Sequence, residues 1–126
     1  MIFIKDDEFI RGSTPMTKEE VRILSIAKLR LSSNSRMLDV GAGTGSISIQ
    51  AALFCNEVVA VEKEKEAIDI IKKNIHKFNI KNIEIINGEA CGLIESIPGE
   101  VDSIFIGGSG GDIEEINLGG NKKIKK

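Results

Sequence analysis

The chain has 126 residues, of which 41% are apolar and 29% charged, and its net charge is -2. This length allows one domain with a modest core, and the composition is typical of a globular protein in water. The near-neutral charge and the lack of an aromatic–basic face argue against nucleic acid as a partner, and no apolar run reaches the roughly 20 residues of a membrane span. Two distant cysteines, and a charged segment at residues 5–8 that is incompatible with a secretory signal, predict reduced thiols and a cytoplasmic protein.

The first predicted elements are an arm and a helix. We expect residues 2–16 to form an ordered arm, because large apolar side chains there need a surface to pack on: Ile2, Phe3, Ile4 and Phe9. Thr17 and Glu20 form a capping box, which predicts a helix over 18–31. Apolar residues recur along this helix at helical spacing, at Val21, Leu24, Ala27 and Leu31. We therefore expect this stripe to lie on a sheet.

The most informative stretch is residues 37–46, an apolar run that stops at glycines spaced two apart. These are Gly41, Gly43 and Gly45. A short apolar run is typical of a buried parallel strand, and glycines at its end permit positive φ and close approach of the backbone to a ligand. A helix is predicted over 46–54, with Thr44 or Ser46 as its cap. Such a strand, turn and helix form the nucleotide sites of open α/β sheets.

The remaining predicted elements alternate between strands and helices. Apolar runs predict strands at 57–62, 83–86 and 101–106. A helix over 63–79 separates the first two of these strands, and its predicted inward stripe is Ala67, Ile71, Ile75 and Phe78. A short helical piece over 91–97 precedes the last strand. This alternation predicts an α/β fold with a doubly wound, mostly parallel sheet and right-handed crossovers.

Three polar residues near these elements are candidates for a functional role. Glu62 ends the second strand, and because neighbouring parallel strands place their carboxyl ends side by side, we expect it to face the glycine loop. A carboxylate there can accept both hydroxyls of a ribose; the alternative is a surface acid in a charged run. Asp39 is expected to hold the glycine loop through backbone N–H groups. His76 has no partners at metal-ligand spacing, so no metal site is predicted.

The glycine spacing differs from that of a dinucleotide-binding fingerprint. Residues 39–45 have the pattern Asp-x-Gly-x-Gly-x-Gly, and Ser46 stands where the third dinucleotide glycine would fall. The pattern resembles the first motif of Rossmann-like class I methyltransferases, which use S-adenosylmethionine. In the pattern of those enzymes the corner after the third strand, here Glu89 and Ala90, borders the adenine.

Two more segments resemble one family within that class. Residues 6–22 include Asp-Asp-Glu-Phe-Ile-Arg-Gly and Thr-Pro-Met-Thr-Lys-Glu-Glu-Val-Arg, and residues 105–111 are Phe-Ile-Gly-Gly-Ser-Gly-Gly. Both resemble signatures of the decarboxylating cobalt-precorrin-6B (C-15) methyltransferases of the CbiT type, and the match runs from about Ile4 to Gly111. The resemblance implies methylation of a precorrin at C-15, with loss of carbon dioxide from the ring-C acetate at C-12, in cobalamin synthesis.

The resemblance also implies which residues bind. Carried over by position, it implies S-adenosylmethionine contacts at Thr17, Gly41, Ala42, Gly43, Thr44, Gly45, Glu62, Glu89 and Ala90. It implies contacts with the tetrapyrrole at Arg11, Gly107 and Gly108. An activated sulfonium methyl needs no metal or covalent nucleophile, and no catalytic residue is assigned. For Thr17 the capping role is an alternative, and the two roles are compatible.

The resemblance weakens after the fourth strand, where members of that family continue and this chain has glycines and a lysine-rich tail. We therefore expect a methyltransferase domain over 1–116, truncated after the fourth strand, and a disordered basic tail over 117–126. An open fourth strand leaves an unpaired edge, which predicts a homo-oligomer, with a tetramer as the working assumption, or exchange of elements between protomers. Two alternatives stay open: a methyltransferase for another small molecule or a protein side chain, and a non-catalytic module that binds an adenosyl nucleotide or NAD.

Overall fold

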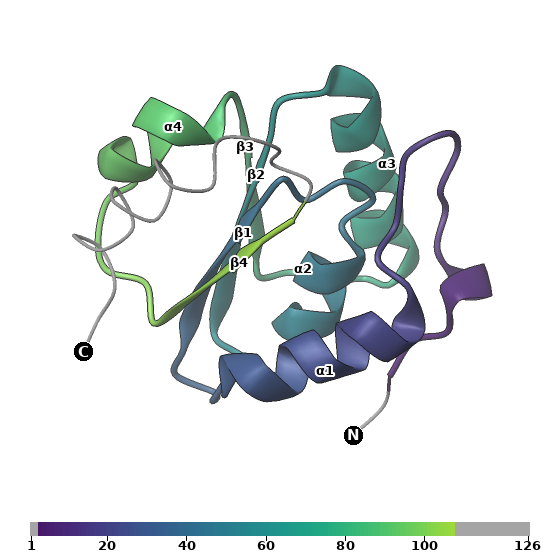
Figure 1. Ribbon diagram of the computed structural model, residues 1–126, viewed down its shortest axis with the longest axis horizontal. Helices are drawn as coiled ribbons and strands as arrows, with labels where there is room; N and C mark the ends of the chain where they lie inside the picture. The colour runs from purple at the N-terminus through teal and green to yellow at the C-terminus, as the bar shows by residue number, and fades with distance from the viewer. Residues whose placement is uncertain (1–2, 108–126) are drawn as a thin grey trace.

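A parallel sheet forms the centre of the computed structural model, which describes residues 3–107 (Figure 1). Its strands are β1 (Arg36–Val40), β2 (Glu57–Glu62), β3 (Ile83–Asn87) and β4 (Ser103–Ile106). Their order in the sheet is β3-β2-β1-β4, and every pairing is parallel. The chain winds outward from β1 to β3 and then crosses back to the other side of β1, which confirms the predicted doubly wound topology. The reversal creates a switch point between β1 and β4, where open α/β sheets place their ligands.

Helices cover both faces of the sheet (Figure 1). One face carries α1 (Glu19–Leu29), α2 (Ser46–Ala52) and α3 (Lys65–Lys77), and the other carries α4 (Ala90–Leu93) with the 3-10 helix η2 (Ile94–Ser96). A second 3-10 helix, η1 (Asp6–Glu8), lies in the arm. The predicted helices are confirmed, with shorter ends for α1, α2 and α3, whereas the piece predicted over 91–97 starts one residue earlier and consists of α4 and η2. Within residues 3–107, no helix is long and apolar enough to cross a membrane.

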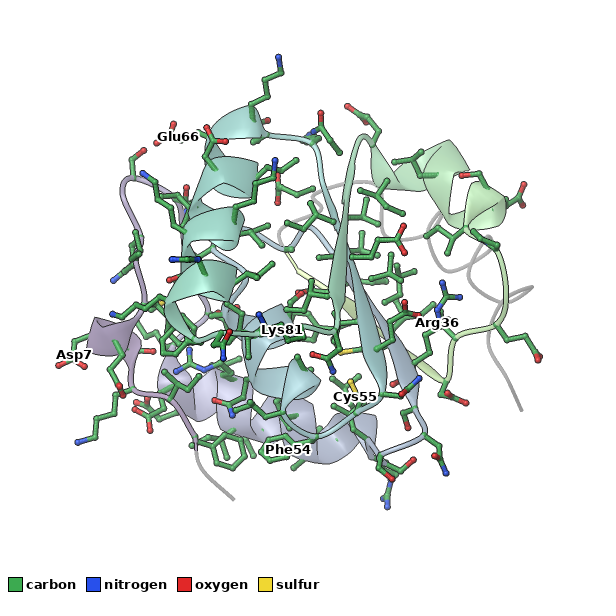
Figure 2. The ribbon with its side chains drawn as sticks, turned by 180° about the vertical axis from the view of Figure 1, so that it is seen from behind. Asp7, Arg36, Phe54, Cys55, Glu66 and Lys81 are labelled. Atoms are coloured by element: carbon green, nitrogen blue, oxygen red, sulfur yellow. The ribbon has the colours of Figure 1, made fainter. Side chains whose placement is uncertain are left out.

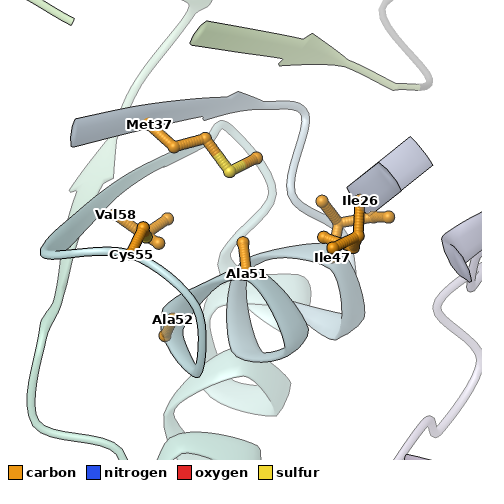
Figure 3. Close-up of a cluster of buried hydrophobic side chains, with 7 residues drawn as sticks. All are labelled: Ile26, Met37, Ile47, Ala51, Ala52, Cys55 and Val58. Atoms are coloured by element: carbon orange, nitrogen blue, oxygen red, sulfur yellow. The ribbon is translucent and has the colours of Figure 1, made fainter. Parts of the chain in front are cut away.

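The core has two layers, and alternate residues of the central strands divide between them. On the α4 side the buried side chains are Leu38, Val40, Val59, Val61, Ile97 and Val101. On the α1 and α2 side they are Ile26, Met37, Ile47, Ala51, Ala52, Cys55 and Val58 (Figure 3). The Cys55 thiol is free and buried, and burial raises its pKa to about 11. Buried packing, as predicted for a reduced cysteine, is thus confirmed for Cys55.

The inward face predicted for α1 is wrong. Val21 is 53% exposed and Leu24 is 61% exposed, and Ala27 is exposed as well. The helix buries Arg22 and Ile26 instead. Apolar spacing alone could not reveal this orientation, because α1 also has to hold a buried cation.

Arg22 is that cation, and it fastens the arm to α1. Its completely buried guanidinium donates to the carbonyl oxygen of Thr17 from Nη1, at 2.7 Å, and to that of Ile4 from Nη2, at 2.6 Å. Nη2 also lies 3.1 Å from the Asp6 carboxylate, and the guanidinium carbon lies 4.9 Å from the centre of the Phe9 ring. A buried cation without such partners is very costly, so these contacts decide which face of α1 points inward.

The capping box predicted at the start of α1 is also wrong. The N-cap residue is Lys18, and no side chain caps the helix there. Thr17 precedes the cap, with its carbonyl oxygen held by Arg22. The helix therefore starts one residue later than the Thr17 cap requires.

The arm is ordered from residue 3 on, as predicted, and Ile2 lies outside the described residues. Ile4 and Phe9 are buried, and Phe3 packs on Phe54, which Figure 2 labels, with the ring centres 5.7 Å apart. The backbone N–H of Ile4 donates to the side-chain oxygen of Gln50 in α2, at 2.8 Å. The arm then runs beside α3 before it enters α1 (Figure 1).

Candidate functional site

The loop between β1 and α2 has the backbone that its glycines predict. The φ angles are +74° at Gly41, +60° at Gly43 and +84° at Gly45. Space is restricted as well: a Cβ on Gly43 would lie 3.2 Å from the carbonyl oxygen of Pro15, and a Cβ on Gly45 would lie 3.2 Å from the Ile71 side chain. Both the dihedral angle and the close neighbours therefore require glycine at these two positions.

The side chain of Thr44 is buried in this loop. It is 1% exposed, and within the described part of the chain its hydroxyl makes no hydrogen bond. It does not cap α2, whose N-cap is Gly45, and Ser46 is the first residue of the helix. The two predicted caps are thus wrong, because a left-handed glycine takes that position. A buried hydroxyl without a partner is costly unless a ligand or water completes it.

Glu62, at the end of β2, points at the glycine loop. The residue is 7% exposed, and its Oε1 accepts the backbone N–H of Gly43 at 2.8 Å. Its Oε2 accepts the backbone N–H of Glu64 at 3.0 Å, just before α3. The expectation that Glu62 faces the glycine loop is confirmed. A carboxylate has about four acceptor positions, so further donors can still bind to it.

Asp39, in β1, is a buried carboxyl beside the same loop. Burial raises its pKa from 3.8 to about 7, the Glu62 charge adds to this rise, and hydrogen bonds from Ser48 oppose it. The Ser48 hydroxyl donates to Oδ2 of Asp39 at 2.5 Å. The expected bonds from glycine-loop N–H groups to Asp39 are therefore wrong. Asp39 instead ties β1 to the first turn of α2.

A cavity of about 580 Å³ lies at this carboxyl edge of the sheet. Its walls come from the arm, the glycine loop, the end of β2 with the start of α3, and the residues that follow β3 and β4. Several predicted binding residues line it: Thr17, Gly41, Ala42, Gly43, Thr44, Glu62, Glu89 and Gly107. Segments that are far apart in the sequence thus meet around one space.

The other predicted binding residues lie elsewhere. Gly45 faces Ile71, and Arg11 is exposed on the arm; neither lines the cavity. Ala90 begins α4, directly after Glu89. Gly108, the rest of the glycine-rich segment after it and the tail over 117–126 lie outside the described residues.

The charge of the cavity wall is strongly acidic. The acids that line it are Asp39, Glu62, Glu64, Glu66 and Glu89. The only lysine or arginine among the described lining residues is Lys63. Such a wall favours a ligand that carries positive charge and disfavours a pyrophosphate. Among the side chains that the structure describes, no group of three or more from His, Cys, Asp or Glu is placed to hold a metal ion.

Sequence reasoning missed part of this site. It did not assign the cavity residues Ser13, Thr14, Pro15, Met16, Lys63, Glu64, Glu66 and Phe105. It also missed Asn74, which is fully buried in α3 and bonds to the arm and the glycine loop. A signal for Asn74 was available, because an asparagine within the buried face of an amphipathic helix needs polar partners there.

Comparison with known proteins places the chain in a family. The sequence model of the precorrin methyltransferase domain matches residues 8–118. The chain belongs to this family. Its relatives include the "Probable cobalt-precorrin-6B C(15)-methyltransferase (decarboxylating)" of Sulfurisphaera tokodaii, 46% identical over 126 residues, and the cobalt-precorrin-6B C(15)-methyltransferase (decarboxylating) of Salmonella typhimurium, 46% identical over 113 residues. The solved structure of precorrin-8W decarboxylase from Methanobacterium thermoautotrophicum is similar to this one with a TM-score of 0.92 and 33% identity.

These relatives extend beyond the region that they share with this chain. The comparisons cover 97% of this chain with the Sulfurisphaera protein, 87% with the Salmonella protein and 97% with the solved structure. The matched region spans 65%, 57% and 67% of those proteins, respectively. The family identified from the sequence motifs is thus confirmed, for a chain that spans about two thirds of its relatives' length or less.

Proposed function

We propose that the cavity binds S-adenosylmethionine and that the complete protein transfers its methyl group to C-15 of a precorrin, with loss of carbon dioxide from the C-12 acetate, in cobalamin biosynthesis. The observation that carries this proposal is the left-handed glycine loop held against the Glu62 carboxylate, at the switch point of a parallel sheet. The precorrin substrate and the reaction in this proposal come from the names of the relatives.

Each wall of the cavity has a role in this proposal. The bare backbone of Gly41–Thr44 takes the amino-acid half of the cofactor, Gly45 allows the turn into α2 behind it, and Glu62 takes the ribose hydroxyls with its remaining acceptor positions. Glu89 and Ala90 border the adenine. The hydroxyls of Thr17 and Thr44 complete the contacts, and Thr44 thereby gains the partner that its buried oxygen lacks.

The acidic wall favours this cofactor over NAD. S-adenosylmethionine has a positively charged sulfonium and an ammonium group, whereas NAD has a pyrophosphate. Beside Glu62, Glu64 and Glu66 a pyrophosphate would meet like charge. The same wall stabilises a sulfonium before the methyl group leaves it.

The chain contributes to the reaction by positioning the reactants and by keeping water away from them. When bound, S-adenosylmethionine supplies an already activated methyl group, so the residues here hold the reactants in line and exclude water. We place the tetrapyrrole at the mouth of the cavity near β4, where Gly107 offers bare backbone to a flat ring. A contact with Gly108, which lies outside the described residues, is proposed from the sequence alone. Arg11 is proposed to pair with a precorrin carboxylate through its fork of donors.

We also infer that the protein is a cytoplasmic homo-oligomer, such as a tetramer. Its proposed partner is a small-molecule substrate, and neither nucleic acid nor a membrane is proposed as a partner. Exposure of Val21 and Leu24 on one helix supports association of copies, because burial in an interface would remove this apolar surface from water. Light scattering of the purified protein tests this, and a monomer at micromolar concentration would contradict it.

Ligand binding tests the proposed function directly. Calorimetry of the purified chain is expected to show binding of S-adenosylhomocysteine and none of NAD. Gly43→Ala should weaken this binding by about tenfold or more, because the added Cβ meets Pro15 at 3.2 Å and the residue has a φ of +60°. Gly92→Ala is the matched control: its φ is +92°, but a Cβ there has nothing within 4 Å.

The outcomes separate the alternatives. Binding of NAD instead of S-adenosylhomocysteine would overturn the methyltransferase proposal, and equal effects of the two glycine variants would remove the loop as its site. Methyl transfer to a precorrin by the complete protein, followed together with release of carbon dioxide, then tests the reaction. Cofactor binding without transfer to any precorrin would leave the non-catalytic alternative.

A further inference from the structure

Helix α3 carries the arm along one of its faces (Figures 1 and 2). Contacts follow at intervals of about one helical turn, and they join Glu66 to Ser13, Ile70 to Gly12, Asn74 to Ile10, Lys77 to Glu8 and Phe78 to Phe9. Figure 2 shows Glu66 at one end of this row, and Asp7, near the other end, on the short helix of the arm. The arm is therefore attached to α3 along its length.

Asn74 differs from the other residues of this row because it also holds the glycine loop. Its Nδ2 donates to the carbonyl oxygen of Ile10 at 2.9 Å, and its Oδ1 accepts the N–H of Ile10 at 2.8 Å. Nδ2 also donates to the carbonyl oxygen of Thr44 at 3.0 Å. One carboxamide thus joins both backbone groups of an arm residue to the loop that begins α2.

Both segments that Asn74 joins line the cavity, with residues 13–17 on the side of the arm and Gly41–Thr44 in the glycine loop. They meet at Gly43, where a Cβ would lie 3.2 Å from the Pro15 carbonyl oxygen. The position of the arm against the loop therefore shapes this part of the cavity wall. Asn74 itself is 0% exposed, so it cannot touch a ligand.

We propose that Asn74 is a positioning residue for the cofactor: from α3, its carboxamide fixes the arm and the glycine loop to each other and so presets the cavity that both of them line. This inference rests on the proposed function of the cavity. Binding to a preset cavity avoids the cost of ordering the arm, so loss of the carboxamide weakens affinity without removing any ligand contact.

The test compares two buried anchors of the arm. Asn74→Ala removes the bonds to both segments, whereas Gln50→Met removes the bond to the N–H of Ile4 and leaves in place the hydrogen bonds described between the arm and the glycine loop. Calorimetry with S-adenosylhomocysteine is expected to give a Kd raised by about tenfold for Asn74→Ala, the scale of one or two lost hydrogen bonds, and by less than about twofold for Gln50→Met. Urea unfolding measures the stability lost in each variant, so that affinity and stability are compared separately.

Asn74→Asp provides a second variant with a pH-dependent readout. An ionised aspartate would face the carbonyl oxygens of Ile10 and Thr44 without a proton to donate, whereas the neutral acid donates one O–H. The ratio of its Kd to that of the wild type is therefore expected to fall as the pH is lowered from 8 towards about 5. This readout also serves if Asn74→Ala does not fold.

Each result counts for or against the inference. A Kd unchanged in Asn74→Ala, equal losses of affinity in Asn74→Ala and Gln50→Met, or a ratio for Asn74→Asp that does not change with pH would overturn it while the cofactor proposal stands. Failure of the wild type to bind S-adenosylhomocysteine would overturn the proposed function, and this inference with it.

Discussion

Polar groups at the two ends of the central strands have different surroundings. At the amino end of β1, Arg36 (Figure 2) pairs with Glu57 of β2 at 2.7 Å and donates from Nη1 to the carbonyl oxygen of Pro98 at 2.6 Å. Its backbone N–H donates to the Asp102 carboxylate at 2.8 Å. Side chains and loops thus close this end of the sheet. Ser103 is the exception, because its buried hydroxyl makes no hydrogen bond within residues 3–107.

At the carboxyl end, polar groups surround an open space instead. Asp39 is a buried acid whose pKa is raised to about 7. In the part of the chain that the structure describes, the Thr44 hydroxyl makes no hydrogen bond and the Glu62 carboxylate bonds only to backbone N–H groups. Charged and unsatisfied groups of this kind cost stability, so a ligand that completes them explains why they persist. The strands therefore supply the frame, and the cavity with its charged and unsatisfied groups lies at their carboxyl end.

The pH dependence of unfolding should show the largest effect of this difference. Because the pKa of Asp39 rises from 3.8 to about 7, the folded protein keeps a proton that the unfolded chain loses above about pH 4. Its contribution to the free energy of unfolding is therefore present below about pH 4 and declines as the pH rises to about 7, by up to about 4 kcal/mol. Urea unfolding of the wild type and Asp39→Asn between pH 4 and 8 measures this decline.

The variant is expected to lack the decline that Asp39 causes. An asparagine can still accept the Ser48 hydroxyl, so the bond between β1 and α2 is preserved. The difference in unfolding free energy, wild type minus variant, should become more negative with rising pH. Parallel curves for the two proteins would mean that Asp39 is not the buried acid described here.

Two acids of β2 give the next largest effect, because they stand at opposite ends of the same strand. Glu62→Gln removes the charge proposed to accept the ribose, so the Kd for S-adenosylhomocysteine should rise by about 100-fold, the scale of two charge-assisted hydrogen bonds. Glu57→Gln breaks the partly exposed pair with Arg36 and should lower stability by about 1 kcal/mol or less, with unchanged affinity. Calorimetry and urea unfolding of both variants measure the two quantities.

Equal effects of the two variants on affinity would contradict the comparison. Far-UV circular dichroism should show that each variant is folded before binding is measured.

The frame could be predicted from the sequence because its signals are local. The run that ends in Glu62 has both the length and the apolar character of a buried strand, and β2 has the predicted bounds. The left-handed φ angles of the glycine loop follow from the glycines themselves. Glu62 could be placed beside that loop because parallel strands align their carboxyl ends. Each of these inferences needs only neighbouring residues and the sheet topology.

What could not be predicted depends on contacts between distant segments. Arg22 is buried because the carbonyl oxygens of Ile4 and Thr17 point at it, and helical spacing cannot show where those oxygens lie. As a result Val21 was assigned to the wrong side of α1. Asn74 was missed for the same reason, since its partner Ile10 is separated from it by 64 residues. Both errors involve the arm, because its backbone forms hydrogen bonds with side chains from three helices.

Thr44→Val should give the smallest effect and the sharpest test of the carboxyl end. Valine has nearly the shape of threonine but no hydroxyl, so in the free protein it removes a buried group without a partner. Stability should then be unchanged or slightly higher, whereas affinity for S-adenosylhomocysteine should fall by about fivefold, the scale of one lost hydrogen bond of about 1 kcal/mol. Thr44→Ser keeps the hydroxyl and should retain most of the affinity. If Thr44→Val instead loses stability and keeps its affinity, the hydroxyl already has a partner inside the protein. The ligand would then not be what completes the hydrogen bonding of Thr44.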